Sequence, residues 1–357
     1  MMNDPKRTQD FPERTQDFGT RITDNWGLIG HEWAVQMLKQ HLTHDSIRHA
    51  YLFSGPPGLG RRTLALRLAQ ALNCPQPVAP GEPCGKCKTC QQIERMQYAD
   101  LTVIQAEKEG GVLKVEQIRS IRQSLVLMPY QGKYRVALFL RFQEANASAA
   151  NALLKTLEEA PPHVLLILTA DTPELLLSTI VSRCEVLRLR SLPVEMVEAS
   201  LRQRGADETT ARLLAHISGG RPGYALRLMD DKEPLKFRAQ RLEDLQSLLK
   251  STRRGRFAYA EKITERKKKD AEAGERFRET LLVWLSFWRD VLLSASGAVA
   301  PLTNVDHLAE IESLAGKLSL AEVRRLVETA EEAIDKLERN VNARLLAEVL
   351  LLDWPHA

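Results

Sequence analysis

The sequence predicts an α/β domain built on a parallel sheet, followed by two helical regions. Between residues 26 and 191, short and almost wholly apolar runs alternate with amphipathic stretches of helical length. Nearly continuous apolar runs are expected of strands that are covered on both faces by helices. After Ser191 such runs stop and only helical periodicity continues. The fold class is therefore α/β, with a small helical module and a helical C-terminal domain.

Composition narrows the class of protein further. The 357 residues include 50 basic and 46 acidic side chains, a net charge of +4 that is far from the profile of a nucleic-acid coat protein. No apolar run approaches the ~18 residues of a membrane span. The N-terminal segment lacks the apolar core of a secretory signal. We therefore expect a soluble cytoplasmic protein, whose closely spaced cysteines hold metal rather than disulfides.

Residues 1–25 contain a tandem repeat, in which RTQDF at residues 7–11 recurs at residues 14–18. The repeat has almost no aliphatic side chain that could nucleate a core, which predicts a disordered tail. A short docking peptide built on Phe11 and Phe18 is the alternative.

Strands and helices alternate in order along the α/β region. The predicted strands are residues 50–54, 101–104, 136–140, 164–168 and 186–189. The predicted helices are residues 33–42, 62–72, 115–125, 147–158 and 173–181. This alternation indicates parallel strands with helical crossovers.

The helical part begins near Pro193. Residues 194–230 predict a few short helices, punctuated by Gly205 and by the GGRPG run at 219–223. From about residue 235 onward the pattern is helical throughout. Apolar side chains recur at helical spacing in residues 277–292, and again in residues 341–352 at Val341, Leu345, Val349 and Leu352.

Four segments follow from these patterns. They are a tail at 1–25, an α/β domain at 26–191 with a cysteine module at 74–90, a small helical module at 192–232 and a helical C-terminal domain at 233–357.

A degenerate phosphate loop follows the first predicted strand. Gly55, Gly58 and Gly60 supply the glycine framework of G-x-x-x-x-G-K-[S/T], whose backbone N–H groups cradle phosphates. Arg61 stands where the motif has the phosphate-binding Lys, and Arg62 stands where it has the Mg²⁺-binding hydroxyl. Thr63 comes one residue late, and on a helix that turns its side chain by ~100°. Weak nucleotide binding stays open, because a helix N-terminus still favours an anion.

The end of the third predicted strand gives independent information on whether the chain can bind Mg²⁺. A carboxylate at its end holds Mg²⁺ in related ATPases, whereas Leu140 and Arg141 end this strand. An arginine there opposes a cation. Glu144 follows and is expected to start the next helix. Both losses predict that this chain does not hydrolyse ATP.

Four of the five cysteines form a C-x9-C-x2-C-x2-C cluster: Cys74, Cys84, Cys87 and Cys90. Four thiolates among Gly and Pro turns are typical of a tetrahedral zinc site. With four protein ligands no position stays open for substrate, so the predicted role is structural. Unliganded surface thiols or a redox pair are the alternative.

Several motifs together resemble one known family. They are residues 29–32 (IGHE), the strand and loop at 50–60, the four-cysteine insert, residues 151–162 (NALLKTLEEAPP) and Ser182-Arg183-Cys184. Weaker likeness returns at residues 284–293 and 340–345. In this order the motifs resemble the AAA+ clamp-loader subunits of bacterial DNA polymerase III. The family implies an AAA+ P-loop domain with a zinc-knuckle insert, a helical lid and an all-α collar domain.

Within that family, the residues at the loop favour one type of subunit. The gamma/tau motor subunits keep an intact phosphate loop and an acidic third strand, which Arg61, Arg62, Leu140 and Arg141 replace here. The resemblance is therefore to the delta-prime type, a stator without ATPase activity.

The resemblance also assigns roles to residues. It implies that Arg183, flanked by Ser182 and Cys184, reaches ATP on a neighbouring subunit as an arginine finger; a surface Arg paired with a carboxylate is the alternative. Thr169 matches a γ-phosphate sensor and Arg221 matches the lid arginine, although neither is expected to contact nucleotide here. The basic runs at 253–256 and 266–269 are interpreted as solvated helix faces, with sequence-blind contact to the DNA backbone left open.

The expected function is that of a delta-prime-like subunit in a hetero-pentamer with gamma/tau and delta, loading a sliding clamp onto primed DNA. Expected cofactors are a structural zinc and ATP bound by neighbouring subunits. No intrinsic ATPase or polymerase activity, and no membrane contact, is expected. The alternatives are an active AAA+ ATPase of divergent gamma/tau type and a stand-alone zinc-dependent nucleic-acid binder.

Overall fold

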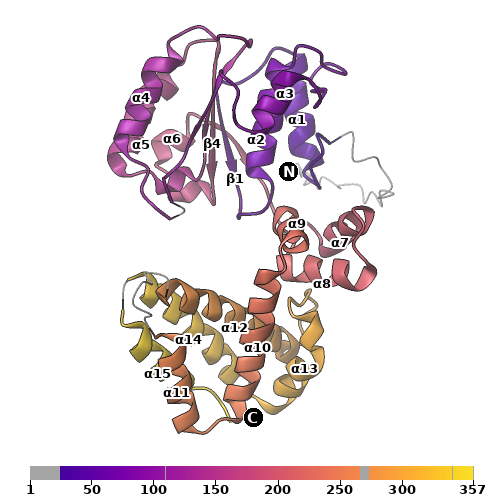
Figure 1. Ribbon diagram of the computed structural model, residues 1–357, viewed down its shortest axis with the longest axis vertical. Helices are drawn as coiled ribbons and strands as arrows, with labels where there is room; N and C mark the ends of the chain where they lie inside the picture. The colour runs from indigo at the N-terminus through magenta and orange to yellow at the C-terminus, as the bar shows by residue number, and fades with distance from the viewer. Residues whose placement is uncertain (1–24, 109, 266–272, 340, 357) are drawn as a thin grey trace, which may run out of the picture.

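The computed structural model describes residues 25–108, 110–265, 273–339 and 341–356. The predicted tail, apart from Asn25, and the basic run at 266–269 lie outside the described residues. An α/β domain forms one end of the molecule, three short helices follow it, and a helical domain forms the other end (Figure 1). Within the described ranges, no helix combines the length and apolarity that a membrane span requires.

The sheet has five parallel strands in the order β2-β3-β4-β1-β5. The strands are β1 (Ala50–Ser54), β2 (Leu101–Ile104), β3 (Arg135–Phe139), β4 (Val164–Ala170) and β5 (Glu185–Arg188). β1 and β4 lie inside the sheet and are buried at every residue. The predicted α/β class is confirmed.

Helices cover both faces of this sheet (Figure 1). One face packs on α1 (Glu32–Thr43), α2 (Arg61–Asn73) and α3 (Lys88–Glu94), and the other on α4 (Val115–Leu125), α5 (Ala147–Glu158) and α6 (Ser178–Val181). Along β1, Tyr51 and Phe53 join the first core, whereas Ala50 and Leu52 join the second. Because successive side chains point to opposite faces, a strand covered on both sides must be apolar at every position.

Two local predictions were wrong. Residues 173–181 form a 3₁₀ turn, η2 (Pro173–Leu175), and the single-turn α6, because Leu177 is extended (φ −59°, ψ 132°). Glu144 ends another 3₁₀ turn, η1 (Phe142–Glu144), and does not start a helix. The next helix begins three residues later, where the Asn146 side chain accepts a hydrogen bond from the Ala149 N–H (2.8 Å).

The helical part contains two separate apolar cores. The first joins α7 (Val194–Gln203), α8 (Glu208–Ser218) and α9 (Pro222–Asp230). The second joins α10 (Glu233–Lys250), α11 (Arg253–Ile263), α12 (Ala273–Ser296), α13 (Leu308–Lys317), α14 (Leu320–Glu338) and α15 (Ala343–Leu352), with the 3₁₀ turn η3 (Val305–His307) before α13. At its centre the Trp284 and Trp288 rings lie edge-on to the Trp354 ring. The ring centroids are 4.9 Å apart for Trp284 and Trp354 and 5.8 Å apart for Trp288 and Trp354.

Arg256 corrects the interpretation of the run at 253–256 as a solvated face. Arg253 and Arg254 are exposed, but Arg256 is buried. Its guanidinium donates to the carbonyl oxygens of Leu248, Leu351, Trp354 and Pro355 at 2.6–3.1 Å. Burial lowers the pKa of Arg256. This arginine therefore ties α10 and α11 to the end of α15.

Asp100 fixes the chain between α4 and β3. The side chain is fully buried and accepts hydrogen bonds from the backbone N–H groups of Tyr130, Gln131 and Gly132 at 2.6–2.8 Å. Burial by itself would raise the pKa of Asp100, but these three donors and Arg135 more than offset it, and the pKa is lowered.

Replacing this carboxylate should destabilise the α/β domain. We expect Asp100→Asn to lower the free energy of unfolding by about 2–4 kcal/mol, because buried N–H donors lose a charged acceptor. Since the folded pKa is lowered, the contribution is complete above the unfolded-state pKa of about 3.9 and is lost as pH falls through the folded value. Urea unfolding at pH 7 and at a series of acidic pH values checks both statements. Equal stabilities of variant and wild type at pH 7 would contradict them.

Candidate functional site

The glycine loop after β1 has backbone conformations that side chains rarely adopt. Gly55, Gly58 and Gly60 have φ values of 142°, 92° and 91°, and α2 begins at the next residue, Arg61. Such angles carry little cost only for glycine. The loop therefore leads from the carboxyl end of β1 into a helix N-terminus, as the motif requires.

The small helical module packs directly on this loop. The Gly223 N–H, in the first turn of α9, donates to the Gly58 carbonyl oxygen at 2.8 Å. A Cβ at Gly58 would lie 3.1 Å from the Tyr224 backbone nitrogen, and one at Gly223 would lie 2.9 Å from the Gly58 oxygen. Both glycines are therefore needed for the close approach of two backbones.

The Arg61 side chain is buried and forms an ion pair within its own chain. Its Nη1 lies 2.8 Å from Oδ1 of Asp171, just beyond the end of β4, and the Arg61 side chain is only 9% exposed. Arg62 is exposed and Thr63 is half-buried. The side chain at the motif's lysine position is thus neutralised by a carboxylate of its own chain.

The end of β3 presents an arginine whose charge is also neutralised. Leu140 is buried, and Arg141 donates from Nε to Oε1 of Glu144 at 2.8 Å. The same Glu144 oxygen accepts the Gly110 N–H (2.9 Å). The Thr169 hydroxyl accepts the Arg141 N–H at 3.0 Å and lies 3.4 Å from the Phe139 carbonyl oxygen. Glu144 and Thr169 therefore serve local contacts at this edge of the sheet.

Arg221 lies at the start of α9, beside the loop. Its Nε donates to the Ser218 carbonyl oxygen at 2.7 Å, and its guanidinium stacks 4.9 Å from the Tyr224 ring centroid. Burial lowers the pKa of Arg221.

Arg183 lies at the surface just after α6. The Nη2 atom is 2.7 Å from Oε1 of Glu158 at the end of α5, and the side chain is 37% exposed. Beside it, Ser182 is exposed and donates to the Thr179 carbonyl oxygen (3.2 Å). Burial raises the pKa of Cys184 to about 12, so this thiol stays protonated at neutral pH. Of the three residues, Arg183 alone carries a charge that another molecule could reach.

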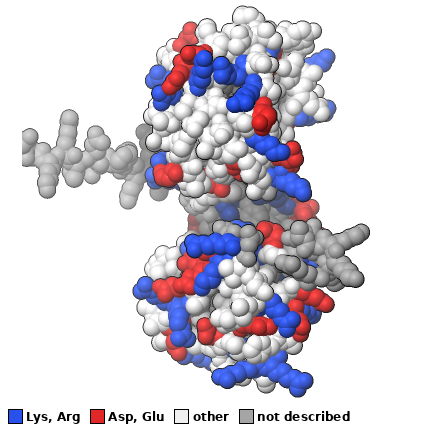
Figure 2. Space-filling model, turned by 90° about the vertical axis from the view of Figure 1, so that its left-hand side faces the viewer, with Lys and Arg blue, Asp and Glu red and all other residues white. Residues whose placement is uncertain are grey.

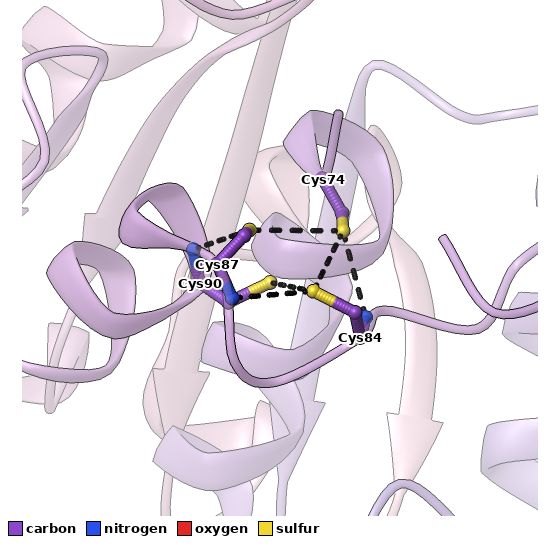
Figure 3. Close-up of side chains that lie close together, drawn as sticks. All are labelled: Cys74, Cys84, Cys87 and Cys90. Carbon is purple, nitrogen blue, oxygen red and sulfur yellow. Dashed lines mark hydrogen bonds between the residues drawn. The ribbon is translucent and has the colours of Figure 1, made fainter. Parts of the chain in front are cut away.

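The four predicted cysteine ligands meet at one point (Figure 3). Cys74 follows α2, Cys84 and Cys87 lie in the intervening loop, and Cys90 lies in α3. The Sγ atoms of Cys74 and Cys84 are 3.6 Å apart, those of Cys74 and Cys87 are 4.0 Å apart, and those of Cys84 and Cys90 are 4.0 Å apart. Tetrahedral zinc with bonds of ~2.3 Å separates its sulfurs by about 3.8 Å. The cluster could therefore hold a metal ion and is compatible with a structural zinc.

Backbone N–H groups point at sulfurs of this cluster and favour the thiolate at Cys84, whereas burial raises the pKa of Cys74 and of Cys90. Cys87 N–H donates to the Cys84 sulfur at 3.3 Å, and Cys90 N–H donates to the Cys87 sulfur at 3.4 Å. Hydrogen bonds from the backbone of Cys87 and Lys86 lower the pKa of Cys84 to about 6. The same geometry makes Cys87 the N-cap of α3, a helix that the sequence analysis did not predict.

The cysteine loop also contacts the rest of the domain. The Trp26 Nε1–H donates to the Gly81 carbonyl oxygen (3.0 Å), and Lys39 of α1 pairs with Glu82. On α2, the Gln70 amide donates to the Cys90 carbonyl oxygen (2.8 Å). A metal here would stiffen a junction between α1, α2 and α3.

The sequence analysis missed the partners of the arginines. Asp171, Glu158 and Tyr224 each lie next to or within a motif that it singled out, but pairing across elements depends on the fold. A carboxylate two or three residues after a predicted strand, as at Asp171, is the signal that could have been used.

Removing a cysteine ligand should release the metal and loosen this junction. We expect one zinc per chain in protein purified without chelator, and none in Cys87→Ser, with Tm lowered by about 5 °C or more because metal binding contributes to folding. Elemental analysis and thermal melting check this. Cys184→Ser is the control and should retain its zinc; full metal content in Cys87→Ser would contradict the assignment.

Comparisons with known proteins agree with this architecture. Residues 30–193 match the family described as "DNA polymerase III, delta subunit", and residues 236–356 match "DNA polymerase III, delta subunit, C terminal". A Bacillus subtilis protein, DNA polymerase III subunit delta', is 28% identical over 89% of this chain and 94% of its own length. Escherichia coli DNA polymerase III subunit tau is 35% identical over 57% of this chain.

This chain spans about a third of the length of that tau relative (32%). Among solved structures, a DNA polymerase III gamma subunit-related protein of Thermotoga maritima aligns with 89% of this chain and 97% of its own, at 17% identity and a TM-score of 0.41. From the two family matches and the delta' relative, we conclude that the chain belongs to the delta-type clamp-loader subunits of bacterial DNA polymerase III.

Proposed function

We propose that this chain is a delta-prime-type stator of the clamp loader: it does not hydrolyse ATP and presents Arg183 to ATP bound on a neighbouring subunit. The assembly would use that ATP to load a sliding clamp onto primed DNA. The observation that carries the proposal is a contrast between two arginines. Arg61 in the chain's own loop is buried on Asp171, whereas Arg183 lies on the surface within reach of another molecule.

Absence of hydrolysis is supported by three positions. Phosphoryl transfer requires a cation at the phosphates and a metal held by a hydroxyl and a carboxylate. Arg61 is paired with Asp171, Arg62 is exposed and offers no metal ligand, and Arg141 stands just after β3, where a metal site would need a carboxylate. ATP is therefore assigned to the neighbouring subunits, and a structural zinc to the four cysteines of this chain.

Arginine is suited to the trans role. The guanidinium stays charged and can donate two parallel hydrogen bonds to a phosphate, which stabilises charge that develops during transfer. In related GTPases such a finger accelerates turnover by roughly 10³–10⁵.

An exposed apolar stripe on α15 supports assembly with other subunits through the C-terminal domain. The sequence pattern at Val341, Leu345, Val349 and Leu352 predicted one helix face. Val341 lies just before α15 and the other three lie on it, and the four side chains are 38–58% exposed. The opposite face, with Ala347, Leu350 and Leu351, is the one buried in the domain. We assign the exposed stripe to contact with the helical domain of a neighbouring subunit, which gives residues 233–357 the role of a collar.

Direct DNA contact receives less support from this chain. On the face drawn in Figure 2, Lys and Arg side chains are interspersed with Asp and Glu over both ends of the molecule. Phosphate backbones are bound by clustered positive charge. We therefore assign DNA binding to the assembly.

Charges on the stripe should disrupt assembly. We expect Leu345→Asp combined with Val349→Asp to weaken association with partner subunits at least about tenfold, because each buried apolar side chain contributes about 1.5–3 kcal/mol. Sedimentation of the mixed subunits measures this. Leu320→Asp, on an exposed leucine of α14, is the control and should assemble normally. Normal assembly of the double variant would exclude the stripe as an interface.

Arg183→Ala tests the trans finger. In a reconstituted loader with clamp and primed DNA, we expect steady-state ATP turnover to fall by about 10²-fold or more, since charge on the transferred phosphoryl group loses its partner. The isolated chain, assayed alongside, should hydrolyse no ATP. Turnover that is indifferent to Arg183 would overturn the proposal. Hydrolysis by the isolated chain that Arg61→Ala abolishes would favour a divergent motor subunit instead.

A further inference from the structure

Two contacts within its own chain hold the Arg183 guanidinium. Nη2 lies 2.7 Å from Oε1 of Glu158, and Nη1 donates to the Thr179 carbonyl oxygen at 2.9 Å. The carboxylate belongs to α5 and the carbonyl to α6, so the arginine bridges two helices. The Glu158 and Arg183 side chains are 50% and 37% exposed, which makes this a solvent-facing ion pair of a kind that breaks easily.

Glu158 occupies a position that its own helix does not favour. It is the last residue of α5, where the partial negative charge of the helix end disfavours a carboxylate. Pro161 and Pro162 follow shortly after and prevent the helix from continuing. The helix therefore ends with this carboxylate beside Arg183, which supplies the compensating charge.

The same carboxylate competes with any phosphate for this arginine. Glu158 lies against Nη2, so a phosphate that approaches this side of the guanidinium meets a carboxylate already in place, although other N–H donors of the guanidinium are left over. Two anions at one guanidinium also repel each other. Contact between Arg183 and a nucleotide phosphate is therefore favoured when Glu158 moves away.

We propose that Glu158 is a latch on the arginine finger: it sequesters Arg183 within its own subunit until the nucleotide phosphate of a neighbour displaces it. This inference rests on the proposed trans role of Arg183. Glu158 acts through Arg183 and is a regulatory partner rather than a catalytic residue.

Glu158→Gln tests the latch, because it removes the charge and keeps the size of the side chain. In the reconstituted loader with clamp and primed DNA, kcat/KM for ATP should rise by about two- to fivefold, the range that corresponds to breaking an exposed ion pair. Glu174→Gln is the matched control. Glu174 pairs with Arg188 at 2.8 Å on the same domain, with both side chains more than half exposed, and its variant should leave kcat/KM unchanged.

A double-mutant cycle separates the latch from other effects. In the Arg183→Ala background, Glu158→Gln should change nothing, since the latch then has nothing to hold. A fall in kcat/KM for Glu158→Gln alone would overturn the latch in favour of a carboxylate that positions the finger, and no change would overturn it outright. A gain that persists without Arg183 would also overturn it. If Arg183→Ala itself leaves turnover intact, the proposed function fails; if only Glu158→Gln is silent, the latch alone fails.

Discussion

Close contact between two backbones, possible only through glycine, holds the α/β domain against the small helical module. The Gly58 carbonyl accepts the Gly223 N–H, and a Cβ at Gly223 would lie 2.9 Å from the Gly58 oxygen. Within the α/β domain a Cβ at Gly55 would lie 2.4 Å from the Leu189 oxygen, and within the small module one at Gly220 would lie 2.1 Å from the Leu192 oxygen. Each of these positions excludes a larger residue whether or not nucleotide is bound. The loop glycines therefore have a packing role of their own. This role explains why they are present although Arg61 and Arg62 replace the phosphate-binding lysine and the metal-binding hydroxyl of the motif.

Three arginines of the α/β domain each have a carboxylate partner, and their exposure differs. Arg61 on Asp171 is 9% exposed, Arg141 on Glu144 is 24% exposed and Arg183 on Glu158 is 37% exposed. Separating Arg61 from Asp171 is costly, since the guanidinium would be left without a partner in a poorly solvated place, whereas an exposed pair exchanges partners readily. The order of exposure is thus an order of availability to an outside phosphate, and it places Arg183 first.

Much of the α/β domain can be predicted from the sequence, because hydrophobic periodicity and the glycines and prolines that end elements are local signals. The strands at 50–54 and 101–104 and the helices at 115–125 and 147–158 have the predicted bounds. The cysteine cluster could be predicted equally well, because the short spacing brings its four ligands together without long-range contacts. Within residues 173–181, by contrast, which were predicted as a helix, Leu175 and Leu177 are 59% and 41% exposed, so an apolar side chain there does not indicate a buried helix face.

Features that depend on tertiary packing could not be predicted in this way. Helical periodicity identifies an apolar stripe but not whether the domain buries it, and on α15 the domain buries the other face. A run of basic residues likewise predicts a solvent-exposed helix face. Arg256 instead donates hydrogen bonds to four carbonyl oxygens, one in α10 and three in residues 95–99 positions further along the chain. Ion-pair partners such as Asp171 are set by which strands become neighbours.

Arg256 has a consequence for the order in which the chain folds during synthesis. All five strands of the sheet are available once Arg188 has left the ribosome, so the α/β domain can form early, as domains generally do. The helical domain cannot: until Leu351, Trp354 and Pro355 emerge, the Arg256 guanidinium lacks most of its acceptors and the tryptophan cluster lacks one ring. While the roughly hundred residues from Arg256 to Pro355 are being synthesised, apolar side chains of α10 and α11 remain exposed. We expect the nascent chain to depend most on chaperones at this stage.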